Sequence, residues 1–210
     1  MSPDLLLASR SPRRAELLRT LGASFAVVDV EVDETPHAAE PAGSYVARLA
    51  GAKARAGRVA SGSSLPVLAA DTTVVCAGEI LGKPADAEDA ARILRRLSGR
   101  WHAVFTGVAL ATDTLAVLAV QVVETRVQFR TLSESEIAAY WASGEPADKA
   151  GAYGIQGLGG ALVARIEGSY SNVVGLPLAE TLALLDACGI PHALGTPSPA
   201  GAHAGLAKTR

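Results

Sequence analysis

Two adjacent arginines, Arg13 and Arg14, stand where the sequence predicts the first turn of a helix. Ser11 and Pro12 come just before them, and a hydroxyl N-cap followed by proline is a typical helix start. A helix N-terminus carries roughly half a positive charge, so an arginine there costs about 0.3–1 kcal/mol unless an anion is near. Exposed amides together with guanidinium groups favour an anion-binding turn, and solvated surface arginines are the alternative.

A single carboxylate, Asp71, interrupts the otherwise apolar residues 66–76, which predict a buried central strand. An unpaired buried charge is strongly unfavourable, so Asp71 needs a metal, a cation or several hydrogen-bond donors beside it. A structural ion pair would satisfy this need. We favour a catalytic or metal-binding carboxylate, because perturbed acidic groups of this kind concentrate at active sites.

Three further groups of charged side chains could belong to the same site. The acids Glu31, Asp33 and Glu34 end an expected strand, where they are either solvated or ligands for a hard cation. Lys53 stands late in an expected helix, a place where a cation commonly compensates the helix dipole. Lys83 stands in a Gly-Lys-Pro turn that departs from the P-loop pattern, so it is a single cation on a stiff turn.

A glycine-rich stretch, residues 148–160, carries Gln156 among five glycines. It lacks the spacing of a dinucleotide-binding loop. Glycines let the backbone approach a ligand closely, and the Gln156 amide offers a donor and an acceptor to a base edge or a phosphate. A plain flexible loop is the alternative interpretation.

The hydrophobic periodicity of the sequence indicates strands and helices that alternate along the chain, which predicts an α/β protein. Strands are expected at residues 5–8, 25–30, 66–76, 102–112, 115–129 and 161–166. Helices are expected at residues 12–21, 43–60, 86–97 and 134–143, with a last one ending at residue 188. Ser133 and Glu136 form a capping box, and Asp113-Thr114 predicts a hairpin turn.

Composition limits the classes of function. The chain has 210 residues, 49% of them hydrophobic, enough for one large domain or two lobes. A net charge of -2 and 4% aromatic residues argue against nucleic-acid binding. Two distant cysteines, no signal-peptide pattern and no apolar run near 20 residues predict a soluble cytoplasmic protein that does not enter membranes. Residues 191–210 show no periodicity and predict a disordered tail.

Taken together, the motifs of this chain resemble those of the Maf nucleotide pyrophosphatases. These are the septum-formation-inhibitor-like hydrolases of nucleoside triphosphates. The resemblance covers about residues 4–190. It rests on residues 8–14, Asp33-Glu34, Lys53, residues 70–72, residues 82–84, residues 148–157 and residues 168–170. Each motif alone is weak, but their joint order is specific.

The resemblance implies one domain at residues 1–190, with a Maf/ITPase-like α/β fold of two lobes around an elongated mixed sheet and a nucleotide in the central cleft. It also implies cleavage between the α- and β-phosphates to a nucleoside monophosphate and pyrophosphate, with Mg²⁺ or Mn²⁺. Asp71-Thr72 and residues 153–156 look like the branch that acts on dTTP and UTP, in control of the nucleotide pool. Modified pyrimidine nucleotides are further possible substrates.

The resemblance also implies roles for individual residues. Asp71 matches the proposed proton acceptor, and we hypothesise that Asp71 and Glu34 together hold the divalent cation. Arg13, Thr72 and Gln156 match the family positions that determine substrate choice. There the Gln156 amide and the Thr72 hydroxyl would form hydrogen bonds with a pyrimidine base. The triphosphate would be bound by Ser9, Arg13, Arg14, Lys53 and Lys83. Arg10 departs from the glycine or asparagine more usual in the family, and adds charge near the phosphates.

Other interpretations stay open at this point. The chain could be a nucleotide-binding regulator of septum formation or cell division in which catalysis is incidental. It could also be a pyrophosphatase of 7-methyl-GTP or other modified purine nucleotides. The sequence leaves the oligomeric state undetermined, with a homodimer as one alternative.

Overall fold

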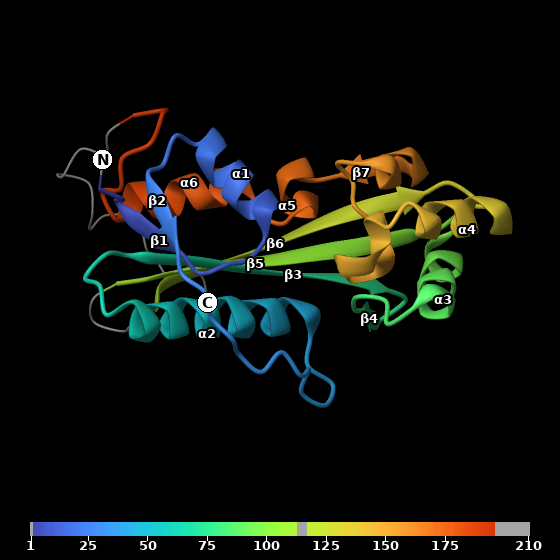
Figure 1. Cartoon of the computed structure of the whole chain (residues 1–210), viewed down its shortest axis with the longest axis horizontal. Helices are drawn as coiled ribbons and strands as arrows, with labels where there is room; N and C mark the ends of the chain where they lie inside the picture. The colour runs from blue at the N-terminus through green and yellow to red at the C-terminus, as the bar shows by residue number, and fades with distance from the viewer. Residues whose placement is uncertain (1, 113–116, 196–210) are drawn as a thin grey trace, which may run out of the picture.

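One mixed β-sheet organises the protein. The computed structural model describes residues 2–112 and 117–195, and within these residues seven strands form the sheet. The strand order is β2-β1-β3-β5-β6-β7, with β4 paired to the far end of β3. The long strands β3, β5 and β6 run along the length of the molecule (Figure 1). The bounds are β1 (Leu5–Leu7), β2 (Phe25–Val27), β3 (Val67–Cys76), β4 (Glu79–Leu81), β5 (Trp101–Ala111), β6 (Val117–Phe129) and β7 (Val163–Glu167).

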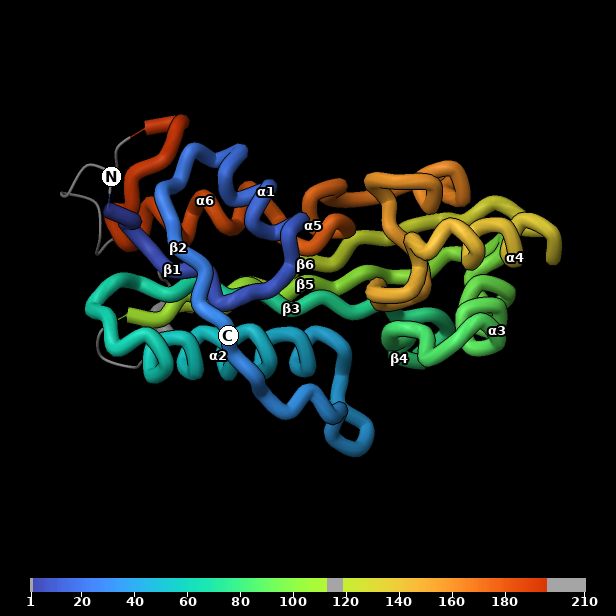
Figure 2. Tube along the Cα trace, in the orientation of Figure 1, coloured from blue at the N-terminus to red at the C-terminus, as the bar shows by residue number. Residues whose placement is uncertain are grey.

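Helices cover the sheet differently at its two ends. At one end α1 and α6 lie on one face and the long α2 lies on the other, while α3 and α4 lie at the opposite end (Figures 1 and 2). The helices are α1 (Pro12–Thr20), α2 (Ala42–Ser61), α3 (Ala87–Leu97), α4 (Glu134–Ala142), α5 (Tyr170–Val174) and α6 (Leu178–Ala187). Three short 3₁₀ segments follow α4, namely η1 (Glu145–Asp148), η2 (Ala150–Ala152) and η3 (Leu158–Leu162). The predicted α/β fold with an elongated mixed sheet is confirmed.

Separate apolar cores divide this single sheet into two lobes. In the first lobe, buried side chains of β1, α1 and α6 pack on one face of the sheet and those of α2 on the other. In the second lobe, α3 and α4 pack with the far ends of β3 and β5 and with the end of β6. Strand β3 contributes Leu68 to the first core and Val74 to the second. The polar residues 71–73 therefore lie where neither apolar core continues.

The local signals in the sequence form the elements they predict. The Ser11 hydroxyl accepts from the backbone N–H of Arg14 at 3.4 Å and caps α1. Ser133 and Glu136 make both bonds of the capping box at α4. The strand expected at residues 25–30 is shorter, because β2 ends at Val27 and the chain leaves the sheet.

Two expectations fall wholly or partly on residues outside the described part. The hairpin turn expected at Asp113-Thr114 lies outside the described residues, although β5 and β6 pair antiparallel as a hairpin requires. The tail expected at residues 191–210 lies outside them from residue 196 onward. Its first residues contact the first lobe, where the Ala193 N–H donates to the Leu21 carbonyl at 2.7 Å.

None of the helices in the described ranges combines the length and the apolar character needed to cross a membrane.

The candidate site lies at a stretch of β3 where one edge of the strand has no neighbouring strand among the described residues. Strand β1 pairs with β3 at Val67 and Leu68, and β4 pairs with β3 from Val74 to Cys76. Between them, residues 69–73 pair only with β5 within the described chain. Side chains of neighbouring strand residues point to opposite faces, so an open edge lets groups from both faces line one space.

Candidate active site

A cavity of about 1130 Å³ opens at the unpaired edge of β3. This volume is somewhat above the roughly 300–1,000 Å³ of typical small-molecule sites, so it can hold a whole nucleotide. The sequence-predicted residues that line it are Ser9, Arg13, Arg14, Glu34, Lys53, Asp71, Thr72, Lys83 and Gln156. The fold thus brings these nine residues to one cavity. Of the other two acids considered as cation ligands, Glu31 also lines the cavity, whereas Asp33 does not and accepts from the Thr35 N–H at 2.9 Å.

The partner of the buried carboxylate is Lys53. Its Nζ atom lies 2.6 Å from Asp71 Oδ1 and 2.6 Å from Glu34 Oε1. The Asp71 side chain is 10% exposed, the Lys53 side chain 13% and the Glu34 side chain 53%. An ion pair was the alternative to a catalytic or metal-binding role for Asp71. This ion pair, however, lies in the wall of a cavity that the other predicted site residues also line.

Close packing of α2 on the sheet positions this pair. Gly107 is the cross-strand neighbour of Asp71. A Cβ atom on Gly107 would lie 2.4 Å from the Val46 carbonyl oxygen, so only glycine lets α2 approach the sheet this closely. Two helical turns after Val46, Lys53 then reaches Asp71.

Burial and charge act in opposite directions on the two carboxylates. Burial raises the pKa of Asp71 above its ordinary value, and the charges of Lys53 and Arg14 only partly oppose this. Burial also acts to raise the pKa of Glu34, but its hydrogen bond to Lys53 and the charges of Lys53 and Lys83 outweigh it and leave that pKa lowered. Asp71 is therefore a stronger base than an aspartate in water, which suits it to accept a proton, whereas Glu34 is a weaker base than a glutamate in water.

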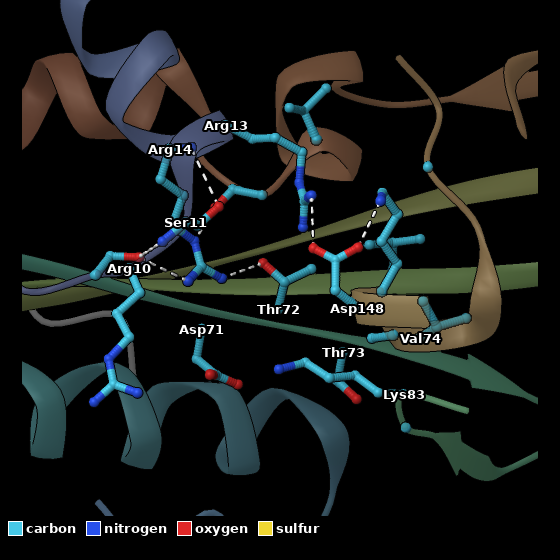
Figure 3. A pocket seen from close by; sticks show the side chains of 18 of the residues that line it. Arg10, Ser11, Arg13, Arg14, Asp71, Thr72, Thr73, Val74, Lys83 and Asp148 are labelled. Atoms are coloured by element: carbon cyan, nitrogen blue, oxygen red, sulfur yellow. Dashed lines mark hydrogen bonds and ion pairs between the residues drawn. The ribbon is translucent and has the colours of Figure 1, made fainter. Parts of the chain in front are cut away.

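Arg14 is fixed by three hydrogen bonds on the opposite face of β3. Its Nε donates to the Gly175 carbonyl at 2.8 Å, its Nη2 to Thr72 Oγ1 at 3.0 Å and its Nη1 to Ser9 Oγ at 3.3 Å. Burial lowers the pKa of Arg14, and Asp71 opposes that effect. Figure 3 shows the guanidinium group directed at Thr72. Arg14 thus links the first turn, β3 and the turn after α5.

Buried hydroxyl groups extend this arrangement across the sheet. Thr72 Oγ1 lies 2.9 Å from Thr106 Oγ1, and Thr106 donates to the Asn172 carbonyl at 3.0 Å. Because the only Thr106 proton is used in that bond, the Thr72 hydroxyl is the donor between the two threonines. Thr72 also accepts from Arg14, so among the described residues it keeps one free acceptor position and no free donor.

The remaining cations of the site have different partners. Arg13 Nη1 lies 3.3 Å from Asp148 Oδ2, a contact that joins the first lobe to the second across the cavity (Figure 3). Lys83 forms no ion pair within the described residues and follows β4 on an exposed turn. Arg10 turns away from Thr72 and is paired with Asp29 and Glu31. The extra charge at Arg10 is therefore locally neutralised.

Gln156 stands at the tip of a short loop, residues 154–159, which we call the Gln156 loop. Its side chain is exposed and makes no hydrogen bond to other residues of the described chain. The loop is held from behind by Glu145, whose carboxylate accepts from the backbone N–H groups of Leu158 at 2.8 Å and Gly159 at 3.0 Å. Part of the glycine-rich stretch therefore has its backbone bound by a side chain that precedes it in the chain.

Sequence reasoning assigned no role to two acidic residues of this region, Glu145 and Asp148. Both residues line the cavity. Glu145 accepts from backbone amides and from the Tyr140 hydroxyl, and Asp148 is paired with the distant Arg13 and with its neighbour Lys149 at 2.6 Å. A Gly-Glu-Pro turn directly before the glycine-rich stretch was the available signal for Glu145. Nothing in the local sequence signals the contact of Asp148 with Arg13.

Two carboxylates of the cavity have the chemistry to bind a divalent cation. Within the described residues no group of three or more His, Cys, Asp or Glu side chains is arranged to hold a metal. Asp71 and Glu34 each bind the Lys53 ammonium group through one oxygen, which brings the two carboxylates together, and the second oxygen of each has no hydrogen bond within the described residues. One or two carboxylates plus substrate phosphates are the usual ligand set of Mg²⁺, and these two residues fit that set.

Comparison with known proteins gives consistent results. A family model described as "Maf-like protein" matches residues 4–188. A relative from Myxococcus xanthus is 59% identical over 188 residues, which cover 89% of this chain and 93% of the relative. One from Escherichia coli strain K12 is 56% identical, over 87% of this chain and 91% of the relative. Both relatives are named dTTP/UTP pyrophosphatase.

A solved structure with a more distant likeness is a nucleoside-triphosphatase, named also dITP/XTP pyrophosphatase, from Mycobacterium abscessus. It is 22% identical with a TM-score of 0.41, and the match covers 67% of this chain and 94% of that chain.

Proposed function

This chain belongs to the Maf family, and we propose on that premise that it hydrolyses dTTP and UTP to the nucleoside monophosphate and pyrophosphate. The observation that carries the proposal is the buried Asp71–Lys53 pair in a cavity also lined by Arg13, Arg14 and Lys83. A triphosphate is a dense anion, and these cations are concentrated in a protein whose net charge is only -2.

The reaction divides into an attack and a departure. Water attacks the α-phosphorus, a new P–O bond forms, and the bond from that phosphorus to the α,β-bridging oxygen breaks. Asp71 takes the proton of the attacking water, for which its raised pKa suits it. The leaving pyrophosphate keeps the electron pair of the broken bond, and Arg13, Arg14 and Lys83 stabilise its charge together with the amides of the first turn of α1.

The cation proposed for this site is Mg²⁺ or Mn²⁺, held by Asp71 and Glu34 with substrate phosphates completing its ligand set. When bound it would supply electrostatic stabilisation of the phosphate oxygens. Lys53 has a separate task, because its ammonium group favours the charged form of the buried Asp71 and opposes the effect of burial on its pKa.

Choice of the base is proposed to lie with Thr72 and Gln156. Thr72 has only an acceptor position to offer, so it can accept from the N3–H of thymine or uracil but cannot donate to a carbonyl without breaking its bond to Thr106. The Gln156 amide N–H₂ would then serve the carbonyl of the base. We propose that Arg13 also influences the choice of base, because it contacts Asp148, which precedes the Gln156 loop in the chain.

One assay tests the proposal against its alternatives. The protein is incubated with Mg²⁺ and dTTP, UTP, dGTP, ATP or 7-methyl-GTP, and monophosphate and pyrophosphate are measured separately. We expect rapid release of both products from dTTP and UTP. Equal efficiency on purine nucleotides would contradict the proposed selectivity, and nucleotide binding without pyrophosphate release would favour a regulatory protein.

A further inference from the structure

A pair of side chains behind the Gln156 loop fixes both of its ends. The Glu145 carboxylate accepts from Leu158 N–H, Gly159 N–H and the Tyr140 hydroxyl, the last at 2.8 Å. The same Tyr140 oxygen accepts from the Gly154 N–H at 3.0 Å. We call Glu145 and Tyr140 the loop clamp. The first residue of the loop is thus hydrogen-bonded to Tyr140 and its last two residues to Glu145, and these two side chains are hydrogen-bonded to each other.

The loop clamp also explains two glycines of the loop. A Cβ atom on Gly157 would lie 2.2 Å from Glu145 Oε2, and one on Gly159 would lie 2.4 Å from the Tyr140 hydroxyl. The φ of Gly157 is −111°, a value that any residue adopts. The requirement for glycine at this position thus comes from the approach of the Glu145 carboxylate and not from backbone strain.

The charge of Glu145 is well suited to this task. Burial acts to raise its pKa, but hydrogen bonds from Gly159, Tyr140 and Leu158 together lower it below the ordinary value. Glu145 is thus a carboxylate at neutral pH, and hydrogen bonds to a charged acceptor are about twice as strong as neutral ones. Gln156, in contrast, makes no polar contact of its own in the described chain, so its position depends on the loop clamp.

We propose that Glu145 is a positioning residue for substrate choice, whose carboxylate holds the Gln156 loop so that Gln156 meets the base at a fixed place. This inference rests on the proposed function, because it assumes a nucleotide in the cavity. Glu145 borders the cavity, but both of its carboxylate oxygens accept from the backbone of the loop, at Leu158 and Gly159, and its effect on the base is assigned to these contacts. Its loss should change affinity for the base and leave affinity for the phosphates unchanged.

The first experiment compares two ligands that differ by the nucleoside. Binding of the α,β-methylene analogue of dTTP and of inorganic tripolyphosphate is measured for the wild type and for Glu145→Gln. The glutamine has one acceptor oxygen where the carboxylate has two, so at least one loop amide loses its partner. We expect affinity for the dTTP analogue to fall about 10- to 100-fold, the range for a lost charged hydrogen bond, with tripolyphosphate changed less than about twofold.

The second experiment links the effect to the loop. Gly157→Ala should displace the Glu145 carboxylate and lower affinity for the dTTP analogue by a similar factor. In a Glu145→Ala background, Gly157→Ala should lower affinity for the dTTP analogue less than about twofold, because the carboxylate atoms with which the new Cβ would clash are absent. Hydrogen exchange of the Leu158 and Gly159 amides should become faster in Glu145→Gln. Glu136→Gln, which weakens the capping box of α4 outside the cavity, controls for a general loss of stability.

The outcomes separate this inference from the proposed function. Unchanged affinity for the dTTP analogue in a folded Glu145→Gln protein would overturn the inference, and so would equal losses for both ligands or additive effects of the two substitutions. If Glu145→Gln does not fold, Gly157→Ala provides the same comparison. A wild type that binds the dTTP analogue far better than tripolyphosphate but hydrolyses no triphosphate would overturn the proposed function alone.

Discussion

The two walls of the cavity are built in different ways. The wall proposed to bind phosphates is built mainly from side chains on regular elements, with Arg14 on α1, Lys53 on α2 and Asp71 on β3, whereas Ser9 and Lys83 stand on turns. These side chains are held by direct hydrogen bonds to each other or to the sheet. The wall that carries Gln156 is a loop beside 3₁₀ segments, and its backbone is bound by the two side chains of the loop clamp.

This difference separates chemistry from selection. Groups on helices and strands are held with little freedom, as a charge-stabilising site requires. A loop can change its sequence or shape without altering the sheet, which suits it to distinguish one base from another. We therefore expect substitutions in the first wall to reduce turnover for every substrate and substitutions in the second wall to change the preference among substrates.

The largest effect is expected for Asp71→Asn. The amide cannot take a proton from water, so kcat should fall by about 10²–10⁴, the range for loss of a general base. Affinity for the α,β-methylene analogue of dTTP should change little, because the phosphate-binding cations remain. Steady-state kinetics and calorimetric binding check both parts. A kcat close to that of the wild type would remove Asp71 from the proposed role.

A smaller loss, accompanied by a change in pH dependence, is expected for Lys53→Met. The ammonium group lowers the pKa of Asp71, so its removal raises that pKa further, and Asp71 then loses its charge at a higher pH. Since the deprotonated form is the proposed base, the acid limb of the pH–rate profile should move to higher pH. At neutral pH kcat should fall about 10- to 100-fold, as for loss of a charged hydrogen bond.

The matched control for that variant is Arg55→Met on the exposed side of the same helix. It should leave the pH–rate profile unchanged. An identical profile for Lys53→Met and the wild type would show that Lys53 does not control the protonation of Asp71.

Gln156→Ala tests the second wall directly. The kcat/KM for dTTP should fall about tenfold, the scale of one lost hydrogen bond between neutral groups in a desolvated site, while tripolyphosphate affinity stays constant. The ratio of kcat/KM for dTTP to that for dGTP should fall with it. Gln121→Ala, an exposed substitution on β6, is the control and should change neither quantity. A uniform loss for pyrimidine and purine nucleotides would place Gln156 with the first wall instead.

The smallest effect is expected for Asp148→Asn, at the contact between the two walls. Arg13 and Asp148 form a partly exposed ion pair with exposed fractions of 29% and 65%. Such pairs contribute about 0–1 kcal/mol, so freeing Arg13 for phosphate should tighten tripolyphosphate binding by no more than about fivefold. The part of the gain that comes from Arg13 should disappear in an Arg13→Ala background, whereas any part from Lys149, whose Nζ lies 2.6 Å from Asp148 Oδ1, should remain; both should shrink at high salt. Weaker binding would instead indicate that Asp148 orients Arg13 for the phosphates.

Much of the fold was predictable because its signals are local. The Ser11-Pro12 cap, the capping box at Ser133 and the apolar run that became β3 each depend on residues a few positions apart. The same apolar run predicted that Asp71 must have a charged or hydrogen-bonding partner, because burial of a lone carboxylate is too unfavourable. Which residue provides that partner was not predictable from periodicity, since Lys53 resembled a cation that compensates a helix dipole.

The sequence by itself therefore determined the elements, the family and the residue types of the site. Only the tertiary structure decided that β3 has an open edge, that Lys53 joins Asp71 to Glu34, and that Glu145 holds the Gln156 loop. The physical reason is the range of the interactions. Caps and periodic patterns act within one or two turns, whereas the contact of Arg13 with Asp148 spans 135 residues and exists only once the sheet has brought the two lobes together.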